Sequence, residues 1–145
     1  MAQSNVSGPI NSEAGFQVNG VAQPVAANST VSAAAGAANT ATITIQLKDG
    51  EGNNVVGVKP VDVYLSDAST GIGITGTAAS TGLSVASGGG VRLVTAITKS
   101  IACVTSATGG LVLSLLDTGK TTYYVVIVVD NGVKVSDQLT TGSYG

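Results

Sequence analysis

The stretch Thr40-Ala41-Thr42-Ile43-Thr44-Ile45-Gln46-Leu47-Lys48 alternates strictly between apolar and polar residues. The alanine, the two isoleucines and the leucine take one set of alternate positions, and threonine, glutamine and lysine take the other. Successive side chains of a β-strand point to opposite faces of a sheet. The period of two therefore predicts a strand at 40–48 with one buried and one solvent-facing side.

Further segments of the same character follow this strand. They are Val61–Leu65, Val91–Ile97, Ser100–Thr105, Leu111–Leu116, Thr121–Val129 and Val133–Val135, with two shorter edge strands expected at 72–75 and 83–85. The Asn131-Gly132 pair between the last two long segments predicts a tight hairpin. Leu111–Leu116 and Thr121–Val129 are apolar on both faces, which indicates central strands or strands that also carry an interface.

The composition agrees with this pattern. Of 145 residues, 46 are the β-branched Val, Ile and Thr, which fit a pleated sheet better than a helix. A chain of this length forms one domain, or one domain with an arm. About seven short strands joined by tight turns predict an all-β fold, an antiparallel Ig-like β-sandwich. A small barrel is the alternative that the pattern leaves open.

Residues 1–39 differ from the rest of the chain. They contain one charged residue, Glu13, and their apolar residues follow no sustained period of 2 or 3.6. We expect an extended N-terminal arm at 1–39 that is ordered against a partner and precedes the sandwich domain at 40–145. A simply flexible tail is the alternative. Deletion of residues 1–39 is then expected to leave a folded domain.

The residues that are scarce exclude several classes of function. The absence of His removes an imidazole base and His-ligated metal, and one Cys cannot build a disulfide or a multi-Cys metal site. Six scattered cations and five Tyr and Phe residues argue against nucleic acid, and no apolar run is long enough for a membrane span. The N-terminus lacks the pattern of a secretory signal. We expect a structural or interaction protein, not an enzyme, without a cofactor or metal.

Four features of the sequence have a functional alternative besides an ordinary structural explanation. Gly71-Ile72-Gly73-Ile74-Thr75-Gly76 matches the dinucleotide-binding fingerprint, but no helix pattern follows it, so we expect a loop. The oxygen-rich segment 49–54 lacks the glycine and distal glutamate of a calcium loop, and a turn explains it. Aspartates such as Asp67, Asp117 and Asp130 stand at strand ends, where turns use them. Cys103 fits a small buried hydrophobe.

Two stretches carry a resemblance to a known family. Val61-Asp62-Val63-Tyr64-Leu65-Ser66-Asp67 resembles a strand and turn found in small Ig-like virion proteins of tailed bacteriophages. The run from Thr108 through Asp117-Thr118-Gly119 to Val125 is similar to a later stretch of the same family. The resemblance covers about residues 40–145. It implies a capsid decoration (cement) or head-fibre role on the exterior of the phage head, without catalytic residues.

This resemblance and the composition together lead to one expected function. The protein is expected to bind the major capsid protein in many copies on the head lattice, as a likeness to these virion proteins implies. Because the chain has few charged residues, its sheet edges have little protection against pairing with another strand. Binding is therefore expected to use apolar burial and added strand pairing. The candidate partner-binding residues in the arm are Phe16, Val18, Val21, Val25 and Val31. Two more, Tyr123 and Tyr124, lie in the predicted strand 121–129, which is apolar on both faces.

A second function belongs to a different class. An Ig-like adhesion or glycan-binding module would use loops 66–90 and 106–110 to contact the host surface. Glycan sites rely on aromatic platforms, and the available candidates are Tyr64, Tyr123, Tyr124 and Tyr144.

Overall fold

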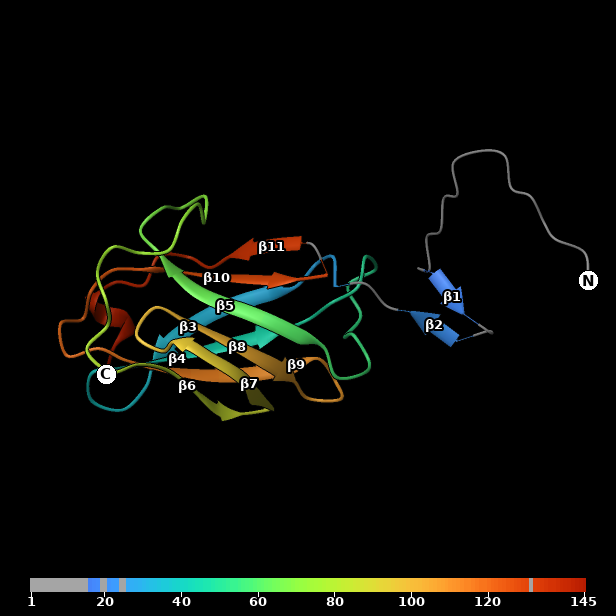
Figure 1. Cartoon of the computed structure of the whole chain (residues 1–145), viewed down its shortest axis with the longest axis horizontal. Helices are drawn as coiled ribbons and strands as arrows, with labels where there is room; N and C mark the ends of the chain where they lie inside the picture. The colour runs from blue at the N-terminus through green and yellow to red at the C-terminus, as the bar shows by residue number, and fades with distance from the viewer. Residues whose placement is uncertain (1–15, 19–20, 24–25, 131) are drawn as a thin grey trace, which may run out of the picture.

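Nine strands form two antiparallel sheets, packed face to face. The computed structural model describes residues 16–18, 21–23, 26–130 and 132–145. The strands are β3 (Thr30–Ala35), β4 (Thr40–Gln46), β5 (Pro60–Ser66), β6 (Gly82–Ser87), β7 (Gly89–Ala96), β8 (Ser100–Thr105), β9 (Gly110–Leu116), β10 (Tyr124–Val129) and β11 (Gly132–Val135). One sheet has the order β11-β10-β5-β8-β7 and the other β3-β4-β9-β6 (Figure 1). The predicted all-β sandwich is confirmed.

The strand order is that of an immunoglobulin-type sandwich with one insertion. If β3, β4, β5, β6, β9, β10 and β11 are lettered A to G, the sheets read A-B-E-D and G-F-C, which is the constant-type arrangement. The remaining strands, β7 and β8, are inserted between D and E, and β8 pairs with β5. Five of the seven longer predicted strands correspond to members of the Ig-like set, namely β4, β5, β9, β10 and β11, and the other two correspond to the added hairpin.

The core lies between the sheets and follows the predicted alternation. Ala41, Ile43, Ile45 and Leu47 are 0–1% exposed, which confirms the buried face predicted for residues 40–48. From β9, Leu111, Leu113 and Leu115 are buried against them, and β5 and β10 supply the opposite layer with their own alternate residues. β9 and β10 are both interior strands, as expected from their apolar character.

Glycine allows close packing where the start of β6 meets the residue that follows β7. Gly82, at the start of β6, has a φ of +103°, a conformation that favours glycine. A Cβ there would collide with the carbonyl oxygen of Ile97, and the amide of Leu83 donates to that same oxygen at 2.8 Å. The end of β7 therefore packs closely against the start of β6, although the two strands belong to different sheets.

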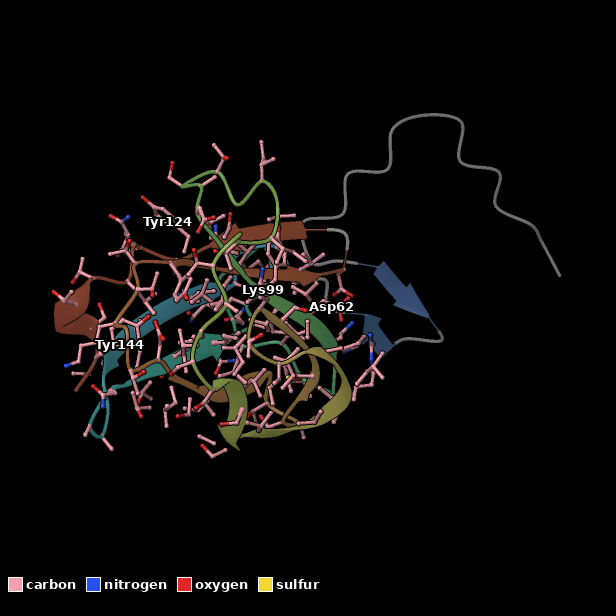
Figure 2. The ribbon with its side chains drawn as sticks, turned by 60° about the vertical axis from the view of Figure 1, so that its left-hand side comes forward. Asp62, Lys99, Tyr124 and Tyr144 are labelled. Carbon is pink, nitrogen blue, oxygen red and sulfur yellow. The ribbon has the colours of Figure 1, made fainter. Side chains whose placement is uncertain are left out.

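Two aspartates organise the longer connections. Asp117 accepts hydrogen bonds from the backbone N–H groups of Ser80, Gly119 and Thr121 at 3.0, 3.3 and 2.8 Å. Asp67 accepts one from the Thr75 hydroxyl at 2.6 Å, and the ammonium group of Lys99 donates to the Thr75 carbonyl oxygen at 3.0 Å. Figure 2 shows Lys99 beside the loop that follows β5. These aspartates serve the turns, as predicted.

The predicted boundary between arm and domain is wrong. β3, which falls within residues 1–39, pairs with β4 over all six of its residues. Ala26 is buried in the core, and its N–H donates to the Asp130 carboxylate at 3.1 Å. An alanine-rich strand with one valine has too weak a period to be recognised beside Gly36. The sandwich therefore includes residues 26–39, and any arm precedes Ala26.

Three smaller predictions have mixed outcomes. The short strand expected at 83–85 is part of β6, whereas 72–75 is a loop. The hairpin between β10 and β11 is confirmed, but Gly132, which was expected in its turn, is the first residue of β11 and lies opposite Val129 of β10. Upstream of the sandwich, β1 (Phe16–Val18) and β2 (Val21–Gln23) pair with each other as a separate two-stranded sheet.

Candidate interaction surfaces

The sandwich has four edge strands, and each is a place where another chain could add a strand. β11 and β7 border the five-stranded sheet, and β3 and β6 border the four-stranded sheet. An edge strand presents unpaired N–H and C=O groups, which proteins protect by bulges, by lysine or by short length. The four edges differ in this protection.

Three of these edges carry recognisable protection. The pairing of β6 with β9 shifts register between Val85 and Ser87. β7 shifts twice against β8, after Val91 and after Leu93. β11 is four residues long and carries the exposed Lys134. Each of these features disfavours a long, regular pairing with another strand.

β3 has none of these protections. Its sequence, Thr-Val-Ser-Ala-Ala-Ala, contains no charge, proline or glycine. It pairs with β4 in unbroken register, and every β3 residue except Val31 is classed as exposed. Sequence reasoning missed this edge because it placed residues 30–35 in the arm. The one local signal is Val31 between Thr30 and Ser32, because the three alanines that follow do not alternate in residue type.

The outer face of the four-stranded sheet continues the uncharged character of β3. The strand register places Ser32 beside Thr44 and Thr44 beside Val112, and Ala34 beside Thr42. Together with Gln46, these side chains make a surface of hydroxyl, methyl and amide groups. Interactions on this face depend on shape and hydrogen bonding more than on charge.

The second surface is an apolar patch on β7. We define the β7 patch as the exposed side chains of Val91 and Leu93 in β7 and of Ile97, the residue after it, with exposed fractions of 50%, 58% and 39%. The bulged register sets Val91 opposite Cys103 but Leu93 opposite Ala102, so these side chains do not share one face of the sheet. Between them, Arg92 reaches over to Asp62 of β5 with an N–O distance of 3.2 Å, and Figure 2 shows Asp62 on that strand. Both charges of this pair are exposed, so the pair adds little to stability. The β7 patch is therefore a set of exposed aliphatic side chains along this edge, with its nearby charges balanced.

The predicted partner-binding residues belong to several different elements. Phe16 and Val18 lie in β1, Val21 lies in β2, and Val25 lies outside the described residues. Val31 is partly buried and packs against the core. None of these residues belongs to the β7 patch, which sequence reasoning did not single out as a partner surface.

The two tyrosines predicted for partner binding have different positions. Tyr123 is fully buried, so its predicted role as a partner contact is wrong for this fold, and its hydroxyl has no hydrogen-bond partner among the described residues. Tyr124, the first residue of β10, is half-buried and pairs with Ser66. The run of apolar residues at 121–129 thus reflects the core more than an interface.

The remaining tyrosines, Tyr64 and Tyr144, form hydrogen bonds within the fold. The Tyr64 hydroxyl donates to the carbonyl oxygen of Gly71 at 2.6 Å, and the Tyr144 hydroxyl donates to that of Thr121 at 2.7 Å. Tyr144 is only 4% exposed and lies near the end of the sandwich (Figure 2). No aromatic platform of exposed rings is therefore present among the described tyrosines.

The titratable groups with shifted pKa values have structural positions. Burial would raise the pKa of Asp117, but hydrogen bonds led by that from the Thr121 N–H outweigh it and hold the pKa below its ordinary value. The hydrogen bond from Thr75 lowers the pKa of Asp67. Burial raises the pKa of Cys103 to about 11, so its thiol stays protonated at neutral pH. Cys103 is also fully buried in the core, which confirms it as a buried hydrophobe.

The other motifs are turns and loops. The Asp49 carboxylate accepts hydrogen bonds from the N–H groups of Glu51 and Asn53 at 3.0 and 2.9 Å, as in an Asx-turn. Gly71 and Gly73 have positive φ angles in a loop with no helix after it. In the described part of the chain, no three His, Cys, Asp or Glu side chains are grouped for a metal, and no helix is long and apolar enough to cross a membrane.

The chain was compared with models of protein families, with curated protein sequences and with solved structures, and none of them matches it.

Proposed function

We propose that this protein is a structural component of a phage virion that decorates the outside of the head by binding the major capsid protein. The observation that carries the proposal is the β7 patch, three exposed aliphatic side chains on and directly after an edge strand. The resemblance of residues 40–145 to Ig-like virion proteins supplies the identity of the partner. Residues with that resemblance make up most of the sandwich.

The β7 patch supports binding through apolar burial. Full burial of an aliphatic side chain contributes about 1.5–3 kcal/mol, and about half of each patch side chain is still accessible. Docking the patch would thus contribute on the order of 3 kcal/mol, which suits a protein held in many copies rather than by one tight contact.

Electrostatics contribute little to this contact. The charges beside the patch, Arg92 and Asp62, already pair with each other, and the whole chain has a net charge of −2 with only 10% charged residues. Salt weakens interactions between exposed charges but strengthens or preserves apolar burial. Attachment is therefore expected to persist at high ionic strength.

The proposal is tested with heads assembled in the absence of this protein. Purified protein is titrated onto these heads, and the bound amount is measured by co-sedimentation at about 0.1 M and about 1 M NaCl. The expected result is saturable binding, regular in stoichiometry and similar at both salt concentrations. Loss of binding at high salt would contradict the apolar mode, and absence of binding at both would contradict the decoration role. Binding to a glycan array without binding to heads would favour the adhesion alternative.

A further inference from the structure

We infer that β3 pairs antiparallel with β3 of a second copy of this chain, about a two-fold axis that passes through Ala33. The inference extends beyond attachment to the head, because it concerns contacts between copies and can be tested on the purified protein alone. It rests on the phase of the β3–β4 ladder, on the symmetry of the β3 sequence and on the state of the other edges.

Two backbone hydrogen bonds establish which β3 groups face the free edge. The N–H of Asn28 donates to the carbonyl oxygen of Lys48 at 3.0 Å, and that of Gly36 donates to Thr40 at 2.9 Å. Hydrogen-bonded pairs alternate with non-hydrogen-bonded pairs in an antiparallel ladder. The even-numbered residues between them therefore direct their N–H and C=O groups toward β4. The backbone N–H and C=O groups of Val31, Ala33 and Ala35 therefore point away from β4, to the open edge of the sheet.

These three residues are self-complementary. When Ala33 faces Ala33 of the second copy, Val31 of each copy faces Ala35 of the other, so all three outward residues form hydrogen-bonded pairs. Each such pair exchanges two backbone hydrogen bonds, which makes about six in total. A register centred on Ser32 instead leaves Ala35 without a partner in β3. In the Ala33-centred register, every outward-facing backbone N–H and C=O group of β3 forms a hydrogen bond with the second copy.

The side chains permit this pairing. On the core-facing side, the facing pairs would be Ala33 with Ala33 and Val31 with Ala35, and the two alanines are exposed in the single chain. On the outer side, Ser32 would lie beside Ala34. All are small and uncharged, so two copies meet without like-charge repulsion. The uncharged outer faces of the two four-stranded sheets then continue across the axis.

The rest of the molecule directs a second copy to β3. β11, the nearby edge of the other sheet, carries Lys134, and a pairing there would bring two lysines together. β6 and β7 lie at the opposite ends of the two sheet orders, so β3 pairing leaves the β7 patch accessible. One strand edge makes a small interface. The pairing is therefore weak in dilute solution and favoured where many copies are held close together.

Cysteine cross-linking tests the register. Ala33→Cys would place two cysteines about 5.5 Å apart between Cα atoms across the axis, within the range of a disulfide. Ala34→Cys is the matched control, because in this register its two copies lie more than about 7 Å apart, beyond that range. The native Cys103 is buried in both variants. We expect Ala33→Cys to form disulfide dimers at least tenfold faster than Ala34→Cys under mild oxidation.

Analytical ultracentrifugation tests the pairing without cross-linking. The average mass of the unmodified chain should rise with concentration toward that of a dimer. Ala33→Pro removes an N–H that points to the free edge and not to β4, so it should weaken dimerisation at least tenfold. Equal cross-linking of the two cysteine variants would overturn the inference, as would a chain that stays monomeric at millimolar concentration. If Ala33→Pro lowers the melting temperature, the cysteine pair decides the question. None of these results depends on binding to heads.

Discussion

The β7 patch provides the most quantitative prediction about attachment. In the perturbation, Val91, Leu93 and Ile97 are all replaced by serine. Their exposed fractions of 50%, 58% and 39% leave about half of each side chain to be buried by a partner. At about 2 kcal/mol for complete burial of one side chain, the three lose on the order of 3 kcal/mol of binding free energy. Since 1.4 kcal/mol corresponds to a factor of ten, the affinity for heads should fall on the order of 100-fold.

The assay is a binding isotherm of labelled protein on heads that lack it. Val133→Ser is the matched control, because Val133 is 57% exposed but lies on β11, at the other border of the same sheet. The control should bind within about twofold of the unmodified chain. Melting curves should show that both proteins remain folded, since exposed substitutions change stability little. Equal affinity of the triple variant and the control would refute the role of the β7 patch.

Three other predictions concern the limits and stability of the domain. Deletion of residues 1–25 should leave the free energy of unfolding within about 0.5 kcal/mol of that of the full chain. Deletion of residues 1–39 removes β3 and Ala26 from the fold, so it should lower the free energy of unfolding, measured in urea, by at least about 3 kcal/mol. If the arm binds heads, the shorter deletion should also weaken attachment; undiminished attachment contradicts that role. The pKa of the Asp117 carboxyl is lower in the folded chain than in the unfolded chain. Asp117 therefore stabilises the fold at a pH above its unfolded pKa, and this stabilisation is lost as the pH falls through its folded pKa. Asp117→Asn should make the free energy of unfolding depend less on pH in the acid range, and an unchanged pH dependence would show that other groups cause it. Cys103, with a pKa raised to about 11, should react with a thiol reagent at pH 8 only as fast as the chain unfolds; rapid reaction in the folded state would contradict its burial.

Local patterns predicted the fold where strands bury one face. The alternation at 40–48 predicted the core residues of β4 because a strand in a sandwich places every second residue in the core. The turn at 49–54 and the hairpin that joins β10 to β11 were predictable from their residue types alone. β3 was not, because its buried side consists of one valine and two alanines at the border of the sheet. A border strand needs little apolar area, so it leaves little pattern.

The surfaces were less predictable than the fold. Tyr123 and Val91 are both apolar positions in strand-like segments, and only the packing shows that one is buried and the other half-exposed. Low charge did predict an edge without electrostatic protection, which β3 is, although β11 carries Lys134. It could not show which edge is regular, because bulges such as those of β7 depend on pairing between distant segments.

The measurement that tests the central proposal most directly is a cryo-electron microscopy map of heads saturated with this protein, compared with heads that lack it. The account predicts additional density, of the size of one β-sandwich per site, at regular positions on the outer surface of the capsid, with the β7 edge toward the shell. Identical maps, or additional density confined to the tail, would contradict the account.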